Sequence, residues 1–291
     1  MNEHQGEISF MVKQEQAEMI NHQAVTLFAD EMPINTQALE NRLCEITEQY
    51  FKNGSLSGVA DTIINRANPN FKNTDAPLPI TRHRYSDDKE YLNAIISSVQ
   101  AMDNTCLCIQ GPPGSGKSFT AKHVISDLVK QGKRIGIMSN SHAAILHLLK
   151  SVIEELPGID MSKVGGFKNQ KDFKEVFTPE EYPDFYYRTT MSFTGKQPYQ
   201  SFSVVGATAY AFVKDVAYED PLDYLFVDEA SQVALAKPIA ISGAAKNIVL
   251  MGDQMQLEQP IRVPILVMQA HLHWNLCLKI MRLFQKIKAY S

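Results

Sequence analysis

Apolar residues recur at helical spacing near the start of the chain. They predict an amphipathic helix that begins near residue 35 and ends at Gly54, and a shorter helix is predicted over residues 57–66. Residues 67–82 are rich in proline and asparagine and are interpreted as an extended linker. We therefore expect residues 1–82 to form a helical lead and a linker. The apolar stripe of the first helix consists of Leu39, Leu43, Ile46 and Tyr50.

From residue 83 onward, short apolar runs alternate with amphipathic segments. Helices are predicted over residues 87–102, 117–131 and 142–155. Strands are predicted at Thr105–Gln110, Arg134–Met138, Ser203–Val205, Tyr224–Val227 and Asn247–Met251. Strands that alternate with helices indicate a parallel sheet covered by helices on both faces. The predicted fold class is therefore α/β.

Residues 159–202 interrupt this alternation and are expected to be an insertion. Their lysines are followed by aromatic residues, and two interpretations remain open. One is a small subdomain with its own aromatic core and a solvated lysine face, which the residue pattern alone favours. The other is a stacking surface for single-stranded nucleic acid. The residues concerned are Lys163, Lys168, Lys171, Lys174, Tyr182, Phe185, Tyr186, Tyr187, Phe193 and Tyr199.

The composition is that of an ordinary soluble globular protein, with 44% hydrophobic and 21% charged residues. The formal net charge of −4 means that overall charge does not indicate nucleic-acid binding. The polar N-terminus has no signal-peptide pattern, no apolar run is long enough to span a membrane, and the four cysteines suggest no disulfide framework. We expect a cytoplasmic protein, with Cys106 and Cys108 as structural thiols in a buried strand.

The segment Gly111–Ser118 reads Gly-Pro-Pro-Gly-Ser-Gly-Lys-Ser, and it lies between a predicted strand and a predicted helix. That context is typical of a P-loop, whose backbone N–H groups wrap phosphate oxygens. Lys117 is predicted to contact the β- and γ-phosphates, and Ser118 to bind Mg²⁺. The predicted phosphate-binding residues are Gly111, Pro112, Pro113, Gly114, Ser115, Gly116, Lys117 and Ser118.

Two further polar segments follow buried strands. Tyr224–Val227 leads into Asp228 and Glu229, and a carboxylate at the end of such a strand emerges beside the P-loop. We predict that Asp228 holds Mg²⁺ and that Glu229 orients the attacking water. The strand Asn247–Met251 is followed by Gln256, whose amide both donates and accepts hydrogen bonds. This glutamine is predicted to contact the γ-phosphate or the attacking water.

These segments resemble motifs II and III of superfamily 1 helicases. Motif II corresponds to Asp228-Glu229-Ala230-Ser231-Gln232 with Pro238 beyond it, and motif III to Gly252-Asp253-x-x-Gln256-Leu257. The branch that the chain resembles includes the nonsense-mediated-decay RNA helicases and the replication nuclease-helicases. The amino-acid sequence around Gln256 is similar to that of bacterial proteins that fuse a RecB-like nuclease to such a helicase.

Two shorter segments agree with the resemblance. Ser139-Asn140 resembles motif Ia, and Gly206-Ala207-Thr208-Ala209 resembles motif Ic. In the family both motifs contact the nucleic-acid backbone, so the resemblance implies that role for Ser139, Asn140 and Thr208. It further implies that residues 83–261 form a RecA-like motor domain that uses ATP and Mg²⁺ and binds single-stranded DNA or RNA.

The chain also departs from the family. The base-reading glutamine has no clear match among Tyr91, Asn93 and Gln100, and a second RecA-like domain with motifs IV to VI and an arginine finger is not found after Ile261. We expect a form truncated after motif III, whose second motor domain a protein partner supplies. The basic tail, residues 262–291, is interpreted as a frameshifted end or as an amphipathic helix.

Full helicase activity is not expected of this chain alone, although its motifs are those of an ATP hydrolase. Two alternatives remain open. One is a module that binds nucleic acid under the control of ATP without turnover. The other is a small P-loop kinase, against which the pair of motifs at Asp228–Gln232 and Gly252–Leu257 argues.

Overall fold

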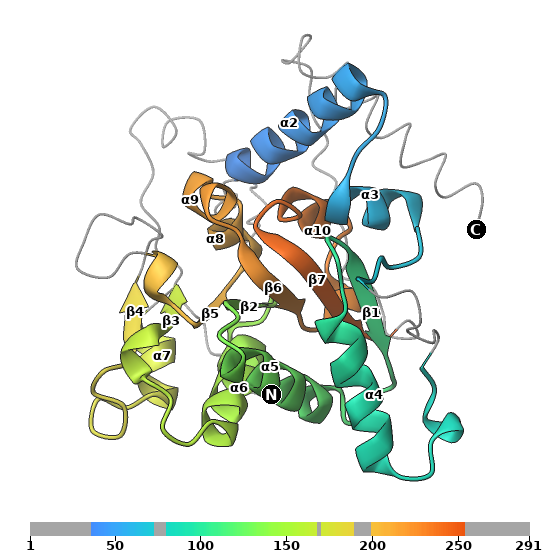
Figure 1. Cartoon of the computed structure of the whole chain (residues 1–291). Helices are drawn as coiled ribbons and strands as arrows, with labels where there is room; N and C mark the ends of the chain where they lie inside the picture. The colour runs from blue at the N-terminus through green and yellow to red at the C-terminus, as the bar shows by residue number, and fades with distance from the viewer. Residues whose placement is uncertain (1–35, 73–79, 168–169, 189–198, 254–291) are drawn as a thin grey trace, which may run out of the picture. The chain divides into compact units, whose positions relative to one another are not determined.

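The computed structural model describes residues 36–72, 80–167, 170–188 and 199–253, which all belong to one compact unit. At its centre lies a seven-stranded sheet in the order β1-β7-β6-β2-β5-β3-β4, and every neighbouring pair is parallel (Figure 1). The predicted α/β class is therefore confirmed. The strands are β1 (Cys106–Gln110), β2 (Ile135–Met138), β3 (Val164–Phe167), β4 (Tyr186–Arg188), β5 (Val204–Ala207), β6 (Leu222–Val227) and β7 (Ala245–Gly252).

Helices cover both faces of the sheet (Figure 1). On one face lie α4 (Asp88–Gln100), α5 (Lys117–Lys130), α6 (His142–Glu155) and α7 (Gln170–Val176). On the other lie α2 (Gln37–Asn53), α3 (Gly58–Asn65), α8 (Ala209–Phe212), α9 (Asp215–Glu219) and α10 (Ala236–Ala240). The strand side chains alternate between the two cores, so that Phe226 packs with the first group and Leu225 with the second. Short 3-10 turns lie at Arg82–Arg84, Met161–Lys163, Tyr199–Ser201 and Ala230–Gln232.

The helices that the apolar pattern predicts before the insertion are confirmed within a few residues. The predicted lead is part of the same packed body, because Leu39 of α2 and Val59 of α3 belong to the core under the sheet. Farther along α2, Ile46 packs with Ile239 of α10. Among the helices in the described ranges, none combines the length and the apolar character needed to cross a membrane.

The interpretation of residues 159–202 as a subdomain with its own aromatic core is wrong. Strand β3 pairs with β5 and β4 pairs with β3, so the segment extends the main sheet. Phe173 and Phe177 belong to the core between the sheet and α4–α6, and Tyr199 is buried in the opposite core. Of the aromatic residues in the possible stacking surface, Tyr199 is buried and Tyr182 and Phe185 are partly buried against the core, whereas the side chains of Tyr186, Tyr187 and Phe193 lie outside the described ones, so the stacking surface stays a prediction.

One cysteine also differs from the expectation. Cys106 is buried, but Cys108, two residues along the same edge strand, is exposed. The two thiols interact, and this interaction lowers the pKa of Cys108 to about 7, although partial burial opposes the change. Cys108 is therefore not the buried structural thiol that the sequence predicts. The tail, residues 262–291, lies outside the described residues.

Candidate functional site

The carboxyl ends of the parallel strands bring the predicted motifs together at one edge of the sheet. The P-loop follows β1, and motif Ia follows β2. Strand β5 ends within motif Ic, and motif II follows β6. Strand β7 ends at the first residue of motif III. Since β1, β7, β6, β2 and β5 are consecutive neighbours in the sheet, all five segments lie in one row.

The P-loop has the backbone shape that phosphate binding requires. Gly114 and Gly116 have φ angles of 76° and 84°, which side chains other than hydrogen rarely allow. Gly116 is also the N-cap of α5, so the helix N-terminus points into the loop. A Cβ on Gly111 would lie 2.3 Å from the Ser115 hydroxyl, so this glycine is needed for the tight turn.

Lys117 lies inside this loop. Its ammonium donates hydrogen bonds to the carbonyl oxygens of Gly111, at 2.5 Å, and of Pro112, at 2.9 Å. The loop is tied in turn to motif III, because the N–H of Gly111 donates to the carbonyl oxygen of Gly252 at 3.2 Å. The P-loop and motif III are thus joined by a backbone hydrogen bond.

Asp228 and Glu229 follow β6 at the same edge. Asp228 is buried, and burial raises the pKa of its carboxyl group; the backbone N–H of Glu229 and the charges of Lys117 and His147 oppose this rise. The P-loop follows β1 and Asp228 follows β6, and within the sheet only β7 lies between these two strands. Glu229 has a φ angle of 53°, a left-handed conformation that costs energy for a residue with a side chain.

Motif III packs tightly against motif II. A Cβ on Gly252 would lie 2.9 Å from the backbone nitrogen of Ser231, so only glycine fits there. Asp253 is buried beside it, and its N–H approaches the Ser231 hydroxyl at 3.5 Å. Gln256, the predicted contact of the γ-phosphate, lies outside the described residues.

The predicted nucleic-acid residues have different surroundings. Ser139 is fully buried, and its hydroxyl faces Glu229 instead of the surface, so direct contact with a strand is not open to it as placed. Asn140 is half-buried; its amide donates to the carbonyl oxygen of Gln232 and accepts from the ammonium of Lys237 at 2.7 Å. Thr208 is half-buried and is the N-cap of α8.

Lys237 was missed by the sequence reasoning. Burial lowers the pKa of its ammonium group. In the sequence, its position next to Pro238 of motif II is the signal that could have identified it. Among the residues considered for base reading, Gln100 donates a hydrogen bond to the carboxylate of Asp127 on α5, which ties its side chain to that helix.

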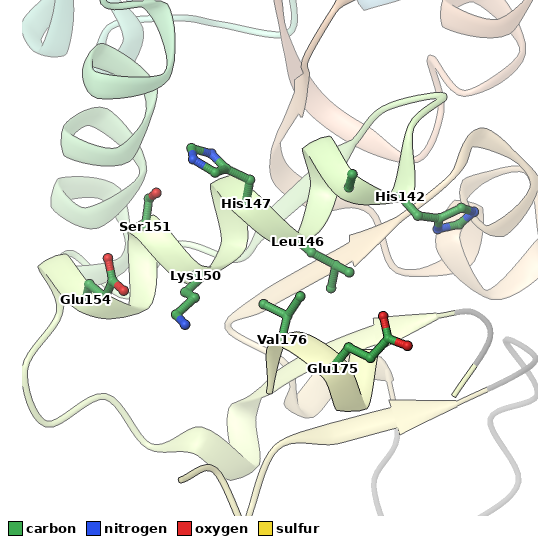
Figure 2. A pocket seen from close by; sticks show the side chains of 9 residues that line it. His142, Leu146, His147, Lys150, Ser151, Glu154, Glu175 and Val176 are labelled. Carbon is green, nitrogen blue, oxygen red and sulfur yellow. The ribbon is translucent and has the colours of Figure 1, made fainter. Parts of the chain in front are cut away.

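A cavity of about 540 Å³ lies between α6 and α7, away from the P-loop. Figure 2 shows Leu146 and Lys150 pointing towards α7 and Val176 pointing back, whereas His147 projects from the other side of α6. Its side chains include one lysine and two glutamates, so its charge does not suit a phosphate backbone. It is lined by His142, Ala143, Leu146, His147, Lys150, Ser151, Glu154, Glu175 and Val176.

A family model described as an AAA domain matches residues 94–261, which is more than half of the chain. The chain belongs to the AAA domain family. The matched segment contains the P-loop, Asp228 and Glu229, and motif III. The assignment therefore rests on the same part of the chain as the site.

Similar proteins include two eukaryotic replication enzymes. The chain is 23% identical over 223 residues to the DNA replication ATP-dependent helicase/nuclease DNA2 of Saccharomyces cerevisiae, a match that covers 75% of this chain and 14% of the relative. It is 23% identical over 247 residues to JHS1, a protein of Arabidopsis thaliana with the same description, over 82% of this chain and 17% of the relative. The chain spans less than a fifth of the length of these curated relatives.

Solved structures of helicases are more distant. The arterivirus nonstructural protein 10 helicase in complex with DNA matches 58% of this chain and 34% of that one, with 17% identity and a TM-score of 0.33. The UvsW helicase of bacteriophage T4 matches 72% of this chain and 69% of that one, with 9% identity and a TM-score of 0.33. These likenesses add nothing to the assignment. The family match and the replication enzymes confirm the predicted resemblance to superfamily 1 helicases, and the AAA domain is a helicase-type motor domain.

Proposed function

We propose that this AAA domain binds Mg-ATP and hydrolyses it when single-stranded nucleic acid is bound. The observation that carries the proposal is that the P-loop with Lys117 and the buried Asp228 follow β1 and β6 at the same edge of the sheet. Glu229 follows directly and supplies a second carboxylate. A P-loop beside such an acidic pair is the arrangement that phosphoryl transfer to water uses.

The residues present fit a magnesium ion. The hydroxyl of Ser118 and the carboxylate of Asp228 are hard oxygen donors, and Mg²⁺ binds to one or two carboxylates together with substrate phosphates and water. A bound Mg²⁺ neutralises developing charge on the phosphate oxygens. In this proposal the positively charged ion also favours the ionised form of Asp228, which burial disfavours.

The other site residues have separate roles in the proposal. The P-loop N–H groups and the ammonium of Lys117 bind the phosphates, and Glu229 orients the attacking water and accepts its proton. Gln256 contacts the γ-phosphate or that water. Turnover by the domain alone should be slow, because an arginine finger contributes about 10³–10⁵ to the rate in comparable systems.

We further propose that a single strand lies across the start of α6 and the start of α8, where Asn140 and Thr208 are the candidates to contact its backbone. Two similar proteins are named as DNA replication ATP-dependent helicase/nucleases. A second RecA-like domain, supplied by a partner, completes the motor in this proposal. Unwinding therefore needs more than the domain described above.

ATP hydrolysis by the purified chain, with and without single-stranded DNA or RNA, tests the proposal. We expect turnover that a strand stimulates and that Lys117→Ala abolishes together with ATP binding. Glu229→Gln should abolish turnover but keep ATP binding. If ATP binds but is not hydrolysed under any of these conditions, the domain is a non-catalytic module and the proposal fails.

A further inference from the structure

Lys237, the second residue of α10, is a cation without a carboxylate partner. Its ammonium donates a hydrogen bond to Oδ1 of Asn140 at 2.7 Å, and with the described residues its side chain makes no other hydrogen bond and no ion pair. An ammonium has three N–H donors, so two of them remain available. Within the described part of the chain, the charge of Lys237 is therefore not neutralised.

The surroundings of Lys237 oppose this charge. The side chain is half-buried, and burial lowers the pKa of its ammonium group. Other cations with little exposure have carboxylate partners in the fold. Arg42 pairs with Asp215 at 2.6 Å, and Arg134 pairs with Asp220 at 2.5 Å. Because a charge removed from water is favourable only when it is paired or hydrogen-bonded, an anion from outside the domain would stabilise Lys237.

The surface at the start of α10 is open to such an anion and already ordered. Leu235, two residues before Lys237, is 42% exposed, so this part of the chain faces solvent. Asn140, which holds the ammonium, is itself fixed by a hydrogen bond from its amide to the carbonyl oxygen of Gln232 at 3.1 Å. A ligand therefore meets a lysine whose position is already restrained, and binding costs less conformational entropy.

The place of Lys237 in the fold indicates the kind of anion. Asn140 follows β2 at the edge of the sheet where the P-loop and motif Ic also lie. The single strand in the proposed function crosses this edge over Asn140 and Thr208, and its backbone carries a negative charge at each phosphate. A lysine ammonium binds phosphate as a compact point charge. A backbone phosphate beside Asn140 therefore has the charge and the position that fit Lys237.

We propose that Lys237 binds a backbone phosphate of the single strand, beside Asn140. The inference rests on the proposed function, since it assumes that a strand crosses this edge of the sheet. It adds a charged contact to a surface whose other candidates, Asn140 and Thr208, are neutral. Lys237 thus supplies a local attraction for nucleic acid that the net charge of −4 does not supply.

The test measures binding of fluorescein-labelled single-stranded oligo-dT and oligo-rU by fluorescence anisotropy, over a series of salt concentrations and without ATP. Lys237→Gln removes the charge, and Lys237→Arg keeps it. Lys246→Gln is the matched control, because it removes the same charge near the other end of β7 from motif III, where Lys246 pairs with Asp223 at 2.9 Å. Circular dichroism checks that all three variants fold.

For Lys237→Gln we expect binding about tenfold weaker at low salt, the effect of losing one hydrogen bond between charged groups. The slope of log Kd against log salt concentration should fall by about 0.7, the contribution of one phosphate contact to a single strand. Lys237→Arg should restore the wild-type slope, and Lys246→Gln should match wild type in both affinity and slope. A purely structural role of Lys237 would weaken binding but leave the slope unchanged.

The inference is overturned if Lys237→Gln keeps the wild-type slope, or if Lys246→Gln loses as much affinity and slope as Lys237→Gln. Unchanged strand binding by Lys237→Gln would point to an acidic segment of a protein partner as the anion, and it also overturns the inference. The proposed function survives either result, because wild type still binds the strand. If wild type binds neither oligonucleotide even at the lowest salt concentration, the proposed function fails and the inference fails with it.

Discussion

Asp228 carries a charge where burial disfavours it, and we expect its replacement to raise stability while removing function. Asp228→Asn keeps an oxygen that can accept from the N–H of Glu229, but it removes the buried charge. Because burial raises the pKa of Asp228 in the fold, the wild type gains stability as the pH falls through that pKa. The variant should therefore have a higher Tm at neutral pH, with the difference closing in acid, and no ATP turnover.

Asp223→Asn is the matched control for this prediction, because its shift has the opposite sign. Burial acts to raise the pKa of Asp223, but hydrogen bonds from the Arg134 N–H and the Lys246 ammonium outweigh it and lower the pKa. Its carboxylate thus stabilises the fold above the unfolded pKa, and this contribution is lost as the pH falls through the folded pKa. Asp223→Asn should lower Tm at neutral pH; a fall for Asp228→Asn as well would contradict our account of the buried charge.

At the residue scale, the sequence predicts the members of the site but not their partners. The spacing within Gly111–Ser118 places Lys117 in a turn before a helix, because that local order alone shapes the loop. The bond between Ser139 and Glu229 depends on β2 and β6 being neighbours in the sheet, which no short segment encodes. The resemblance implies that Ser139 contacts the nucleic-acid backbone, whereas in the structure this residue is buried.

At the scale of the elements, there is no room for an added methyl group at Gly252, which ends β7, or at Gly243 just before β7. We expect only the change at Gly252 to affect ATP turnover. Gly252→Ala places a methyl group 2.9 Å from the Ser231 nitrogen and pushes motif II away from the P-loop. We expect ATP turnover to fall by about tenfold to a hundredfold, because small misplacements of reacting groups have effects of that size. Turnover under saturating ATP and a strand measures this.

Gly243→Ala, just before β7 begins, provides the control. Its methyl group would lie 2.3 Å from the Tyr218 ring, far along the strand from the site. Overpacking of this kind costs about 1–3 kcal/mol of stability. We expect a lower Tm but nearly unchanged turnover, and equal losses of turnover in the two variants would mean that the contact between motifs II and III is not specific.

The strand β3 shows why the sequence of residues 159–202 does not predict that this segment extends the main sheet. Its sequence, Val-Gly-Gly-Phe, has two glycines and little strand propensity. Both glycines are required by packing, since a Cβ on Gly165 would lie 2.6 Å from the Phe202 ring and one on Gly166 would lie 2.1 Å from the Phe173 ring. The two glycines make this strand hard to predict from the sequence, and the same two glycines leave room for the aromatic rings that pack on it.

Phe173→Ala tests this packing. Phe173 is 1% exposed, and its loss should cost about 3–5 kcal/mol in the free energy of unfolding. The matched variant Lys174→Ala changes the next, exposed residue and should cost little. Urea denaturation measures both. An unchanged stability for Phe173→Ala would contradict its place in the core.

At the scale of the whole molecule, the N-terminal helix α2 is expected to contribute to the stability of the motor domain. Ile46→Ala removes a side chain buried against Ile239, and should cost about 2–5 kcal/mol. Tyr50→Ala, one turn later on the same predicted stripe, changes a residue that is 37% exposed and should cost much less. Thermal unfolding that stays a single transition with a lower Tm for Ile46→Ala would show that α2 unfolds with the sheet.

The position of β1 has a consequence for how the protein is made. Within the described residues β1 is an edge strand of the sheet and pairs with β7 alone, which is the last of the described strands to be synthesised. The pairing is therefore among the least local in the fold, and such contacts form late because the chain between them must first be ordered. The P-loop is synthesised early, but its hydrogen bond to Gly252 can form only after β7 has been synthesised. We therefore expect the proposed ATP site to form in a nascent chain only after β7 has emerged from the ribosome.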